Sequence, residues 1–430
     1  MELILENVRC FAGKHIIPIK PLTILVGENS SGKSTALAML STMGDPVGFP
    51  MRPQFNEAPY DLGSFRTIAT LGGEAGGANH FSVGYSGGSD SVDAGNEVLA
   101  KYQSIEGQVE LTELRIKGSE GRELSLILNV YHKRYMAVLS IPWRGRTDTV
   151  EFAFDESFGE DGRLDSRSFL RTELLRVKRQ GAKLELDADW LTEALKALEP
   201  LSRLRTLSIA PIRTKPRRTY DQVTEAFDPE GNHIPLALAR ILAEQSTSAQ
   251  KKALLSGLKR FGQESRLFSD ISLRSLGDAP ADPFQVMVTV GGRPTNLLDV
   301  GYGVSQVLPL VVQGIIAAEE GLLLIQQPEV HLHPRAQAAL GSLLVDLVAK
   351  DAKQFVIETH SDYIVDRIRM EIADGKLPSD AVVILYLERE GTETTVYPIK
   401  VDSLGNLIGV PPTYREFFLR EEMNLLTRGG

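Results

Sequence analysis

The stretch GENSSGKST, residues 27–35, decides the fold that we expect for this chain. It satisfies the pattern Gly-x-x-x-x-Gly-Lys-Ser and follows the apolar run LTILV of residues 22–26. The Ala/Leu-rich run of residues 34–43 comes next and predicts a helix. A strand, a glycine turn and a helix in this order predict a phosphate-binding loop, because the backbone N–H groups converge on an anion at the start of the helix.

Each residue type in this loop has a chemical reason. Lys33 can supply a positive charge to the β and γ phosphates, and the hydroxyl of Ser34 can coordinate Mg²⁺. A Gly/Ser turn without a ligand would not account for a lysine inside the turn. We therefore predict that the loop binds ATP and Mg²⁺ through Gly27, Glu28, Asn29, Ser30, Ser31, Gly32, Lys33, Ser34 and Thr35.

Composition excludes some classes of protein. The chain has 430 residues, a formal net charge of −9 and a single cysteine, Cys10, so no internal disulfide can form. Its first residues lack the basic and apolar regions of a signal peptide. The longest apolar region, residues 307–325, is interrupted by Gln313, Glu319 and Glu320, which argues against a membrane span. We expect a cytoplasmic protein without a membrane partner.

The pattern of apolar and polar residues changes twice along the chain. Residues 98–154 contain β-type runs separated by polar turns, which predict an antiparallel sheet. Residues 159–183, 187–205 and 234–261 have helical patterns, whereas the last third alternates strands and helices, as a covered parallel sheet requires. We predict an N-terminal part of residues 1–158, a helical insertion of residues 159–278 and a C-terminal part of residues 279–430.

Four stretches occur in an order that identifies a family resemblance. They are LENVRCFAGKHIIPIKPLTILVGENSSGKST at residues 5–35, DVGYGVSQVLPL at 299–310, LLLIQQPEVHLHP at 322–334 and VIETHSDYIV at 356–365. Together they resemble the ABC-type ATPase heads of the structural-maintenance-of-chromosomes (SMC), RecF and overcoming-lysogenization-defect (OLD) class. The resemblance implies an α/β P-loop NTPase head, with a mixed and parallel sheet, flanking helices and an antiparallel β-subdomain, here with an inserted helical domain.

The resemblance also implies roles for residues outside the loop. Arg9 matches a strand position that faces the nucleotide, although a solvent-facing strand arginine is the alternative. In such heads two protomers sandwich two nucleotides, and a signature helix of one head caps the nucleotide of the other. By that likeness Gly303, Ser305 and Gln306 act on the nucleotide of a second copy, and the chain forms an ATP-sandwiched homodimer or a higher oligomer.

Two glutamines stand where this family usually carries acids. Gln326 matches the Walker B acid that faces Mg²⁺, and Gln327 matches the acid that positions the attacking water. An amide brings no charge to Mg²⁺ and is a very poor general base. We predict Gln326, Gln327 and His360 as the catalytic positions, and Ser34 and Gln326 as the magnesium-facing residues. Either Gln326 is a Glu-to-Gln change that traps ATP, or this is a natural head that hardly hydrolyses it.

Other clusters give weaker signals. His331 and His333 could form a metal pair, but no third ligand at a matching spacing is visible, and the segment matches the D-loop of the family. Asp187 and Asp189 suggest a carboxylate pair, yet the tail of residues 381–430 contains no Asp-x-Asp, and we expect no Toprim nuclease in this chain. A nuclease or toxin is therefore expected as a separate effector protein.

The resemblance implies three candidate functions. The first is an ATP-gated assembly that controls a separate effector, in bacterial defence against phage. The second is a RecF-like DNA-repair ATPase, and the third is a non-hydrolysing scaffold. A DNA or RNA partner is suggested by the basic residues of the middle third, which are Arg171, Arg176, Lys178, Arg179, Arg203, Arg205, Arg213, Lys215, Arg217 and Arg218.

Overall fold

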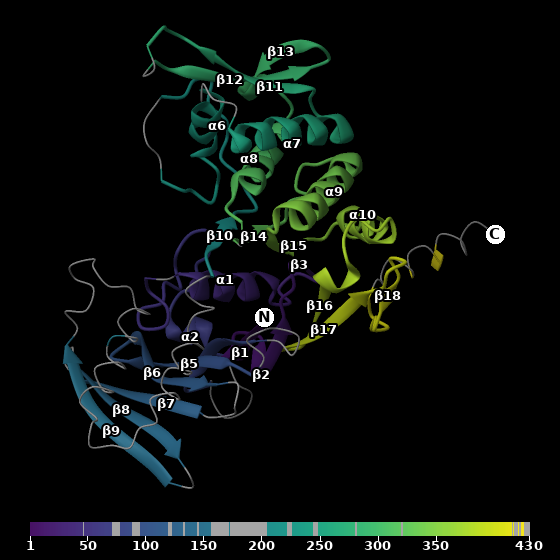
Figure 1. Cartoon of the computed structure of the whole chain (residues 1–430). Helices are drawn as coiled ribbons and strands as arrows, with labels where there is room; N and C mark the ends of the chain where they lie inside the picture. The colour runs from purple at the N-terminus through teal and green to yellow at the C-terminus, as the bar shows by residue number, and fades with distance from the viewer. Residues whose placement is uncertain are drawn as a thin grey trace.

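The computed structural model folds into three β-sheets and the helices that cover them (Figure 1). The structure describes residues 1–45, 47–70, 78–87, 95–118, 123–131, 134–143, 146–155, 172, 204–221, 226–243, 248–279, 282–319, 321–414, 416, 420, 423 and 424.

A seven-stranded sheet carries the glycine loop. Its order is β10 (Thr206–Ile209), β14 (Leu322–Gln326), β15 (Gln354–Glu358), β3 (Leu22–Gly27), β16 (Val382–Glu390), β17 (Glu393–Val401) and β18 (Leu407–Ile408). The strands from β10 to β16 are parallel, whereas β17 and β18 are antiparallel additions. The carboxyl ends of β3, β14 and β15 therefore meet at one edge, where ligands of α/β sheets bind.

Alternate residues of the central strands enter two different cores. Leu25, Leu324 and Val356 lie in a core with α1 (Lys33–Gly44) and the antiparallel sheet. Their neighbours Ile24 and Ile325 lie in a second core with the helices that follow in the chain. The parallel sheet is thus covered on both faces, which confirms the prediction from the alternation of strands and helices.

Five helices build the second core. They are α6 (Ile234–Ala243), α7 (Ala249–Ser265), α8 (Tyr302–Ile316), α9 (Pro334–Asp351) and α10 (Asp362–Ala373). Helix α9 contacts α7, α8 and α10, and so forms the centre of this layer (Figure 1). Three short helices complete the described elements: α2 (Phe65–Ile68), η1 (Leu297–Asp299) and η2 (Ser379–Ala381).

An eight-stranded antiparallel sheet lies on the α1 side of the molecule (Figure 1). Its order is β2 (Phe11–Pro18), β1 (Glu2–Val8), β4 (Phe81–Ser86), β5 (Glu97–Ile105), β6 (Gln108–Lys117), β7 (Glu123–Tyr131), β8 (Arg134–Trp143) and β9 (Arg146–Asp155). The predicted antiparallel subdomain is therefore present. The N–H of Thr394 donates to the carbonyl of Cys10 at 2.8 Å, which ties the β1–β2 turn to β17.

The middle of the chain differs from the helical pattern that we predicted. Apart from Thr172, the predicted helix 159–183 lies outside the described residues, as does most of the predicted helix 187–205. The single helix predicted over 234–261 is wrong, because Ser248 caps a new helix by accepting a hydrogen bond from the N–H of Lys251. Strand β10 pairs in parallel with β14, and β11 (Asp270–Ser275) forms a three-stranded sheet with β12 (Phe284–Val290) and β13 (Arg293–Asn296). The division at residues 158 and 278 stays a prediction.

The longest apolar region of the sequence is divided between two elements. It contributes the end of α8 and, after a turn, most of β14. Within the described ranges, no helix combines the length and the apolar character needed to cross a membrane.

Candidate functional site: a nucleotide cleft at the start of α1

An open cleft of about 580 Å³ lies where α1 begins. The glycine loop, the β1–β2 turn, α2 and the ends of β15 and β16 contribute to its lining. A single acidic residue, Glu358, lines it together with four basic residues, which are Arg9, Lys33, Arg66 and Arg389. Its volume is within the range of small-molecule sites, and an excess of one charge sign concentrates ligands of the opposite sign. The cleft therefore suits an anion.

The two glycines of the loop are required by its close packing. Gly27 has φ +141°, and a Cβ there would lie 2.2 Å from the carbonyl oxygen of Leu387. Gly32 has φ +99°, and a Cβ there would lie 2.7 Å from Cys10 Sγ. Side chains at these positions would displace β16 or the β1–β2 turn, so the pattern read from the sequence has a steric cause.

Distant residues hold the loop in shape. Arg389 Nη1 donates to the carbonyl of Ser30 at 2.9 Å, and Thr394 Oγ1 donates to the carbonyl of Ser31 at 3.0 Å. These bonds connect two carbonyls of the loop to β16 and β17. Since the loop is ordered before a ligand arrives, less conformational entropy is lost on binding. Arg389 and Thr394 could not be predicted from the sequence, because each lies more than 350 residues along the chain from its partner in the loop.

The side chains of the loop divide into an exposed tip and a buried base. Glu28, Asn29 and Ser30 are exposed, as is Ser34 at the start of α1. Ser31, Lys33 and Thr35 are buried. The predicted nucleotide-binding residues of the loop thus form one continuous feature of the structure.

Lys33 is held at the base of the loop. Its side chain is 3% exposed, and Nζ donates to the carbonyls of Gly27 at 3.0 Å and Glu28 at 2.6 Å. Burial lowers the pKa of the Lys33 ammonium, and the Glu358 carboxylate acts in the opposite direction. An ammonium has three donors, so these two bonds leave one N–H for a further acceptor. A phosphate oxygen would favour the charged form of Lys33 in the same way as Glu358 does.

Arg9 lines the cleft, but it does not lie on a strand. It follows the end of β1 with φ +48°, and its guanidinium donates to the carbonyls of Thr67 at 3.2 Å and Leu62 at 3.1 Å. These bonds anchor the turn to α2. The alternative of a solvent-facing strand arginine is therefore wrong, whereas contact of Arg9 with phosphate stays a prediction.

The carboxyl end of β14 lies beside the end of β15. Gln326 pairs with Glu358 in the parallel ladder, and the Gln327 N–H donates to the Glu358 carbonyl at 2.8 Å. Gln326 is 7% exposed, and its Oε1 has no hydrogen-bond partner among the described residues. Ser34 Oγ donates to Glu358 Oε2 at 2.7 Å.

These oxygens fit a magnesium ion. Mg²⁺ prefers oxygen ligands and binds through one or two carboxylates together with the phosphates of a nucleotide. The hydroxyl of Ser34 and the carboxylate of Glu358 supply such ligands in the lining of the cleft, and the buried, unpaired oxygen of Gln326 lies on the neighbouring strand. A bound Mg²⁺ would neutralise phosphate charge, while these residues orient it.

His360 is linked to the segment after β14. Its backbone N–H donates to Glu329 Oε1 at 2.7 Å, and Thr359 Oγ1 donates to Glu329 Oε2 at 2.8 Å. The ring of His360 is exposed and lines a second cavity of about 280 Å³, which Gly27 and Glu28 also line. Glu329 therefore positions the loop before α10, and His360 lies next to the exposed tip of the glycine loop.

The signature-like residues are arranged differently from what the resemblance implies. Ser305 and Gln306 are 5% and 1% exposed, and Ser305 Oγ donates to the carbonyl of Tyr302 at 2.9 Å. Their side chains are buried within this chain, and their action on the nucleotide of a second copy stays a prediction. The exposed start of α8 consists of Gly301 and Tyr302, followed by the half-buried Gly303.

Gln306 instead connects α8 to the segment after β10. Its Oε1 accepts the N–H of Arg213 at 3.1 Å, and its Nε2 donates to the carbonyl of Arg213 at 3.2 Å. Arg213 is 2% exposed, its Nη2 donates to the carbonyl of Gln326 at 3.3 Å, and burial lowers its pKa to about 10. Gln306 and Arg213 thus join the signature-like helix to the end of β14.

Replacing Gln306 by alanine is expected to destabilise the fold by about 3 kcal/mol, because two buried backbone groups lose their partners. Thermal or denaturant unfolding measures this loss. Gln306→Glu is the matched comparison, since its carboxylate can still accept from the Arg213 N–H but cannot donate to the Arg213 carbonyl. A Gln306→Ala protein as stable as the parent would show that this pairing does not hold α8.

The histidine pair 331 and 333 and some of the basic residues of the middle third make contacts within the fold. His333 caps α9 by accepting the N–H of Arg335, and the ring of His331 packs edge-on against Tyr302 with centroids 4.6 Å apart. Among the basic residues of the middle third, Arg213 is buried and Arg218 forms a bidentate pair with Asp299 at 2.7 and 2.8 Å. These contacts leave fewer basic side chains for nucleic acid than the sequence suggests.

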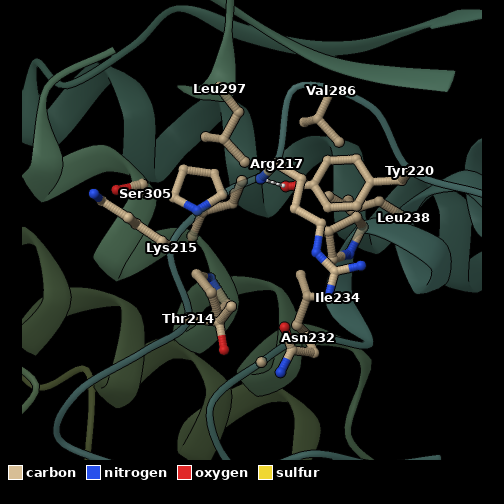
Figure 2. A pocket seen from close by; sticks show the side chains of 15 residues that line it. Thr214, Lys215, Arg217, Tyr220, Asn232, Ile234, Leu238, Val286, Leu297 and Ser305 are labelled. Carbon is tan, nitrogen blue, oxygen red and sulfur yellow. Dashed lines mark hydrogen bonds between the residues drawn. The ribbon is translucent and has the colours of Figure 1, made fainter. Parts of the chain in front are cut away.

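Lys215 and Arg217 line a small pocket beside α8, to which Ser305, Leu308 and Pro309 of that helix also contribute (Figure 2). Its other walls are mostly apolar and include Leu238, Val286 and Leu297. The Arg217 N–H donates to Tyr220 Oη at 2.9 Å across one side. Among the described residues, none lines both this pocket and the nucleotide cleft.

Comparisons with known proteins agree with this geometry. A family model described as "AAA domain, putative AbiEii toxin, Type IV TA system" matches residues 151–366, which is half of the chain. The OLD nuclease of Thermus scotoductus (strain ATCC 700910 / SA-01) is 25% identical over 402 residues, which cover 90% of this chain and 64% of that protein. The chain therefore spans less than two thirds of the length of this curated relative.

Solved structures that resemble the chain include two SMC heads. The SMC head bound to the C-winged helix domain of ScpA has a TM-score of 0.44 at 12% identity. The match covers 93% of this chain and 97% of the SMC head chain. The SMC head domain from Thermotoga maritima has a TM-score of 0.39 at 12% identity, with 93% and 98% covered. With its glycine loop on β3 and the Walker B-like strand two positions away in the sheet, the chain belongs to the AAA-domain family whose model matches residues 151–366.

Proposed function

We propose that this chain binds Mg·ATP in the cleft at the start of α1 and assembles with further copies of itself around the bound nucleotide. The observation that carries the proposal is the loop itself, with Lys33 at its base, Ser34 at the start of α1 and a lining rich in basic residues. Backbone N–H groups at the start of α1 add the positive end of the helix dipole.

The start of α8 is the surface that we propose for the contact between copies. Tyr302 is 44% exposed there, and the first N–H groups of a helix have no partner within the helix. Such groups favour a negative charge, so the triphosphate bound to one copy can accept hydrogen bonds from these N–H groups in another copy. Gly303 takes part through its backbone in this proposal, whereas Ser305 and Gln306 position the helix from inside.

A side chain at Gly301 is expected to prevent assembly without disturbing the single chain. No atom lies within 4 Å of a Cβ built on Gly301, so Gly301→Glu fits the folded protein and places a negative charge at the proposed contact. We expect the parent protein to at least double in mass when Mg·ATP is added, and Gly301→Glu to stay monomeric with unchanged ATP affinity. Mass photometry with and without Mg·ATP measures both.

Ser256→Glu is the control for added charge, because Ser256 is exposed on α7. This variant is expected to assemble like the parent protein. If the mass of the parent does not change with Mg·ATP, the assembly proposal fails. If Gly301→Glu assembles normally, the start of α8 is not the contact.

We propose that hydrolysis is slow in this chain, because amides occupy positions 326 and 327 at the end of β14. The same amides favour a second candidate function, a non-hydrolysing scaffold whose assembly depends on nucleotide alone. Phosphate release measured alongside the change in mass separates the two functions. Assembly with no measurable release favours the scaffold.

We further propose that the assembled form controls a separate effector, such as a nuclease or toxin, in defence against phage. The family description and the relationship to an OLD nuclease support this role. The test is whether a protein encoded beside this chain co-purifies with it in Mg·ATP and dissociates when nucleotide is removed. DNA affinity that falls steeply with salt would instead favour a RecF-like repair ATPase.

A further inference from the structure

A single carboxylate faces the hydroxyl that begins α1. Glu358 ends β15, the strand between β3 and β14, and is 4% exposed. Its Oε2 accepts the hydroxyl of Ser34 at 2.7 Å, and it is the one acidic residue in the lining of the cleft. The two residues are 324 positions apart in the sequence.

Glu358 also lies directly beside the position that lacks an acid. In the parallel ladder it is the partner of Gln326, so the two side-chain positions are neighbours on adjacent strands. The family places the magnesium-facing acid at the end of β14, where this chain has an amide. The charge missing from one strand is therefore present one strand away, at the same edge of the sheet.

The burial of Glu358 calls for a compensating charge. In the part of the chain that the structure describes, Glu358 forms no ion pair within 4 Å, although the Lys33 ammonium is close enough to be affected by its charge. A buried carboxylate is costly unless a cation or several hydrogen bonds compensate it. The single side-chain bond from Ser34 is one neutral donor.

We propose that Glu358 provides Mg²⁺ with the carboxylate that the end of β14 lacks. The inference rests on the proposed binding of Mg·ATP. Ser34 Oγ, Glu358 Oε2 and the unpaired Gln326 Oε1 then form the oxygen set on the protein side, and the phosphates form the other side. The competing explanation is structural: Glu358 serves only as an acceptor that orients Ser34 at the start of α1.

The test compares ATP binding with and without the metal. A fluorescent ATP analogue is titrated into the parent protein, Glu358→Gln and the control Glu390→Gln, each with excess Mg²⁺ or with EDTA. Glu390 is an exposed acid at the end of β16 that does not line the cleft, so its variant loses the same charge without changing the lining. We expect Mg²⁺ to tighten binding about 10-fold or more in the parent and the control, the size of one charge-assisted interaction. In Glu358→Gln, the ratio of the dissociation constants without and with Mg²⁺ should fall close to one.

An exchange variant guards against a folding defect. Gln326→Glu combined with Glu358→Gln moves the carboxylate from β15 to β14 at the same register, and it is expected to recover the effect of Mg²⁺. The electron paramagnetic resonance of Mn²⁺ added with ATP gives a second readout, with bound metal in the parent and the exchange variant and little in Glu358→Gln. This readout does not depend on turnover.

The results separate this inference from the proposed function. If Glu358→Gln keeps the full effect of Mg²⁺ and binds Mn²⁺ like the parent, Glu358 is only a structural acceptor and the inference fails. If the exchange variant behaves like Glu358→Gln, a carboxylate at this register does not hold the metal, and the inference fails as well. If the parent does not bind ATP under either condition, the proposed function fails and the inference fails with it.

Discussion

Replacing Lys33 by alanine is expected to weaken ATP binding about 100-fold. Lys33 is the buried cation at the base of the loop, and the variant would leave the phosphates to the backbone groups of the loop and to the arginines of the lining. Removing one partner of a buried, hydrogen-bonded charge pair costs about 3 kcal/mol, and each 1.4 kcal/mol corresponds to a factor of ten in affinity. Titration of ATP into both proteins, followed by calorimetry or fluorescence, measures the change.

Lys353 is a matched control for Lys33, because it is also a buried lysine whose pKa is lowered by burial. Its Nζ donates to the carbonyls of Gly314, at 2.9 Å, and Ile315 near the end of α8. Lys353→Ala should therefore lower the melting temperature while keeping the affinity for ATP. Lys33→Ala should keep the melting temperature, since its partners belong to a solvent-accessible loop. If Lys33→Ala binds ATP as tightly as the parent, the assignment of the cleft is wrong.

Replacing Gln326 by glutamate is expected to raise the turnover of ATP by about 100-fold. The change adds a carboxylate at the end of β14, next to Glu358 in the ladder. An amide at this position brings no charge to Mg²⁺, whereas a well-held metal ion contributes several kcal/mol of transition-state charge stabilisation. In the proposed site Glu358 supplies charge beside Ser34, and among the described residues no second acid lines the cleft. Phosphate release under saturating Mg·ATP measures the gain.

Two further glutamine variants test whether the gain in turnover is specific to position 326. Gln327→Glu changes the next residue, whose backbone has φ +42° and whose N–H is bonded to the Glu358 carbonyl, and we expect it to give a smaller gain. Gln250→Glu changes an exposed position on α7 and should leave turnover unchanged. Equal turnover by the parent and Gln326→Glu would show that the amide at position 326 does not limit hydrolysis. The non-hydrolysing scaffold would then be the better explanation.

Several residues lie in a different environment in the tertiary structure from the one that the sequence suggests. Arg213 belongs to a stretch that looks basic and solvent-exposed in the sequence, yet it is buried against the end of β14. Ser305 and Gln306 match a signature motif, but their side chains face the interior. In each case the sequence shows the chemical group, and the direction in which it points depends on which helix or strand lies next to it.

The sequence by itself determined the glycine loop and its flanking strand and helix, and it indicated the parallel sheet and the antiparallel sheet. These features depend on residues that are neighbours in the chain: a turn needs glycine at particular positions, and the apolar spacing sets the period of each element. Only the tertiary structure decided that Glu358 meets Ser34, that Arg389 holds the loop and that β10 joins the central sheet. Those contacts join distant segments, so they follow from the order and register of the strands, which local patterns do not encode.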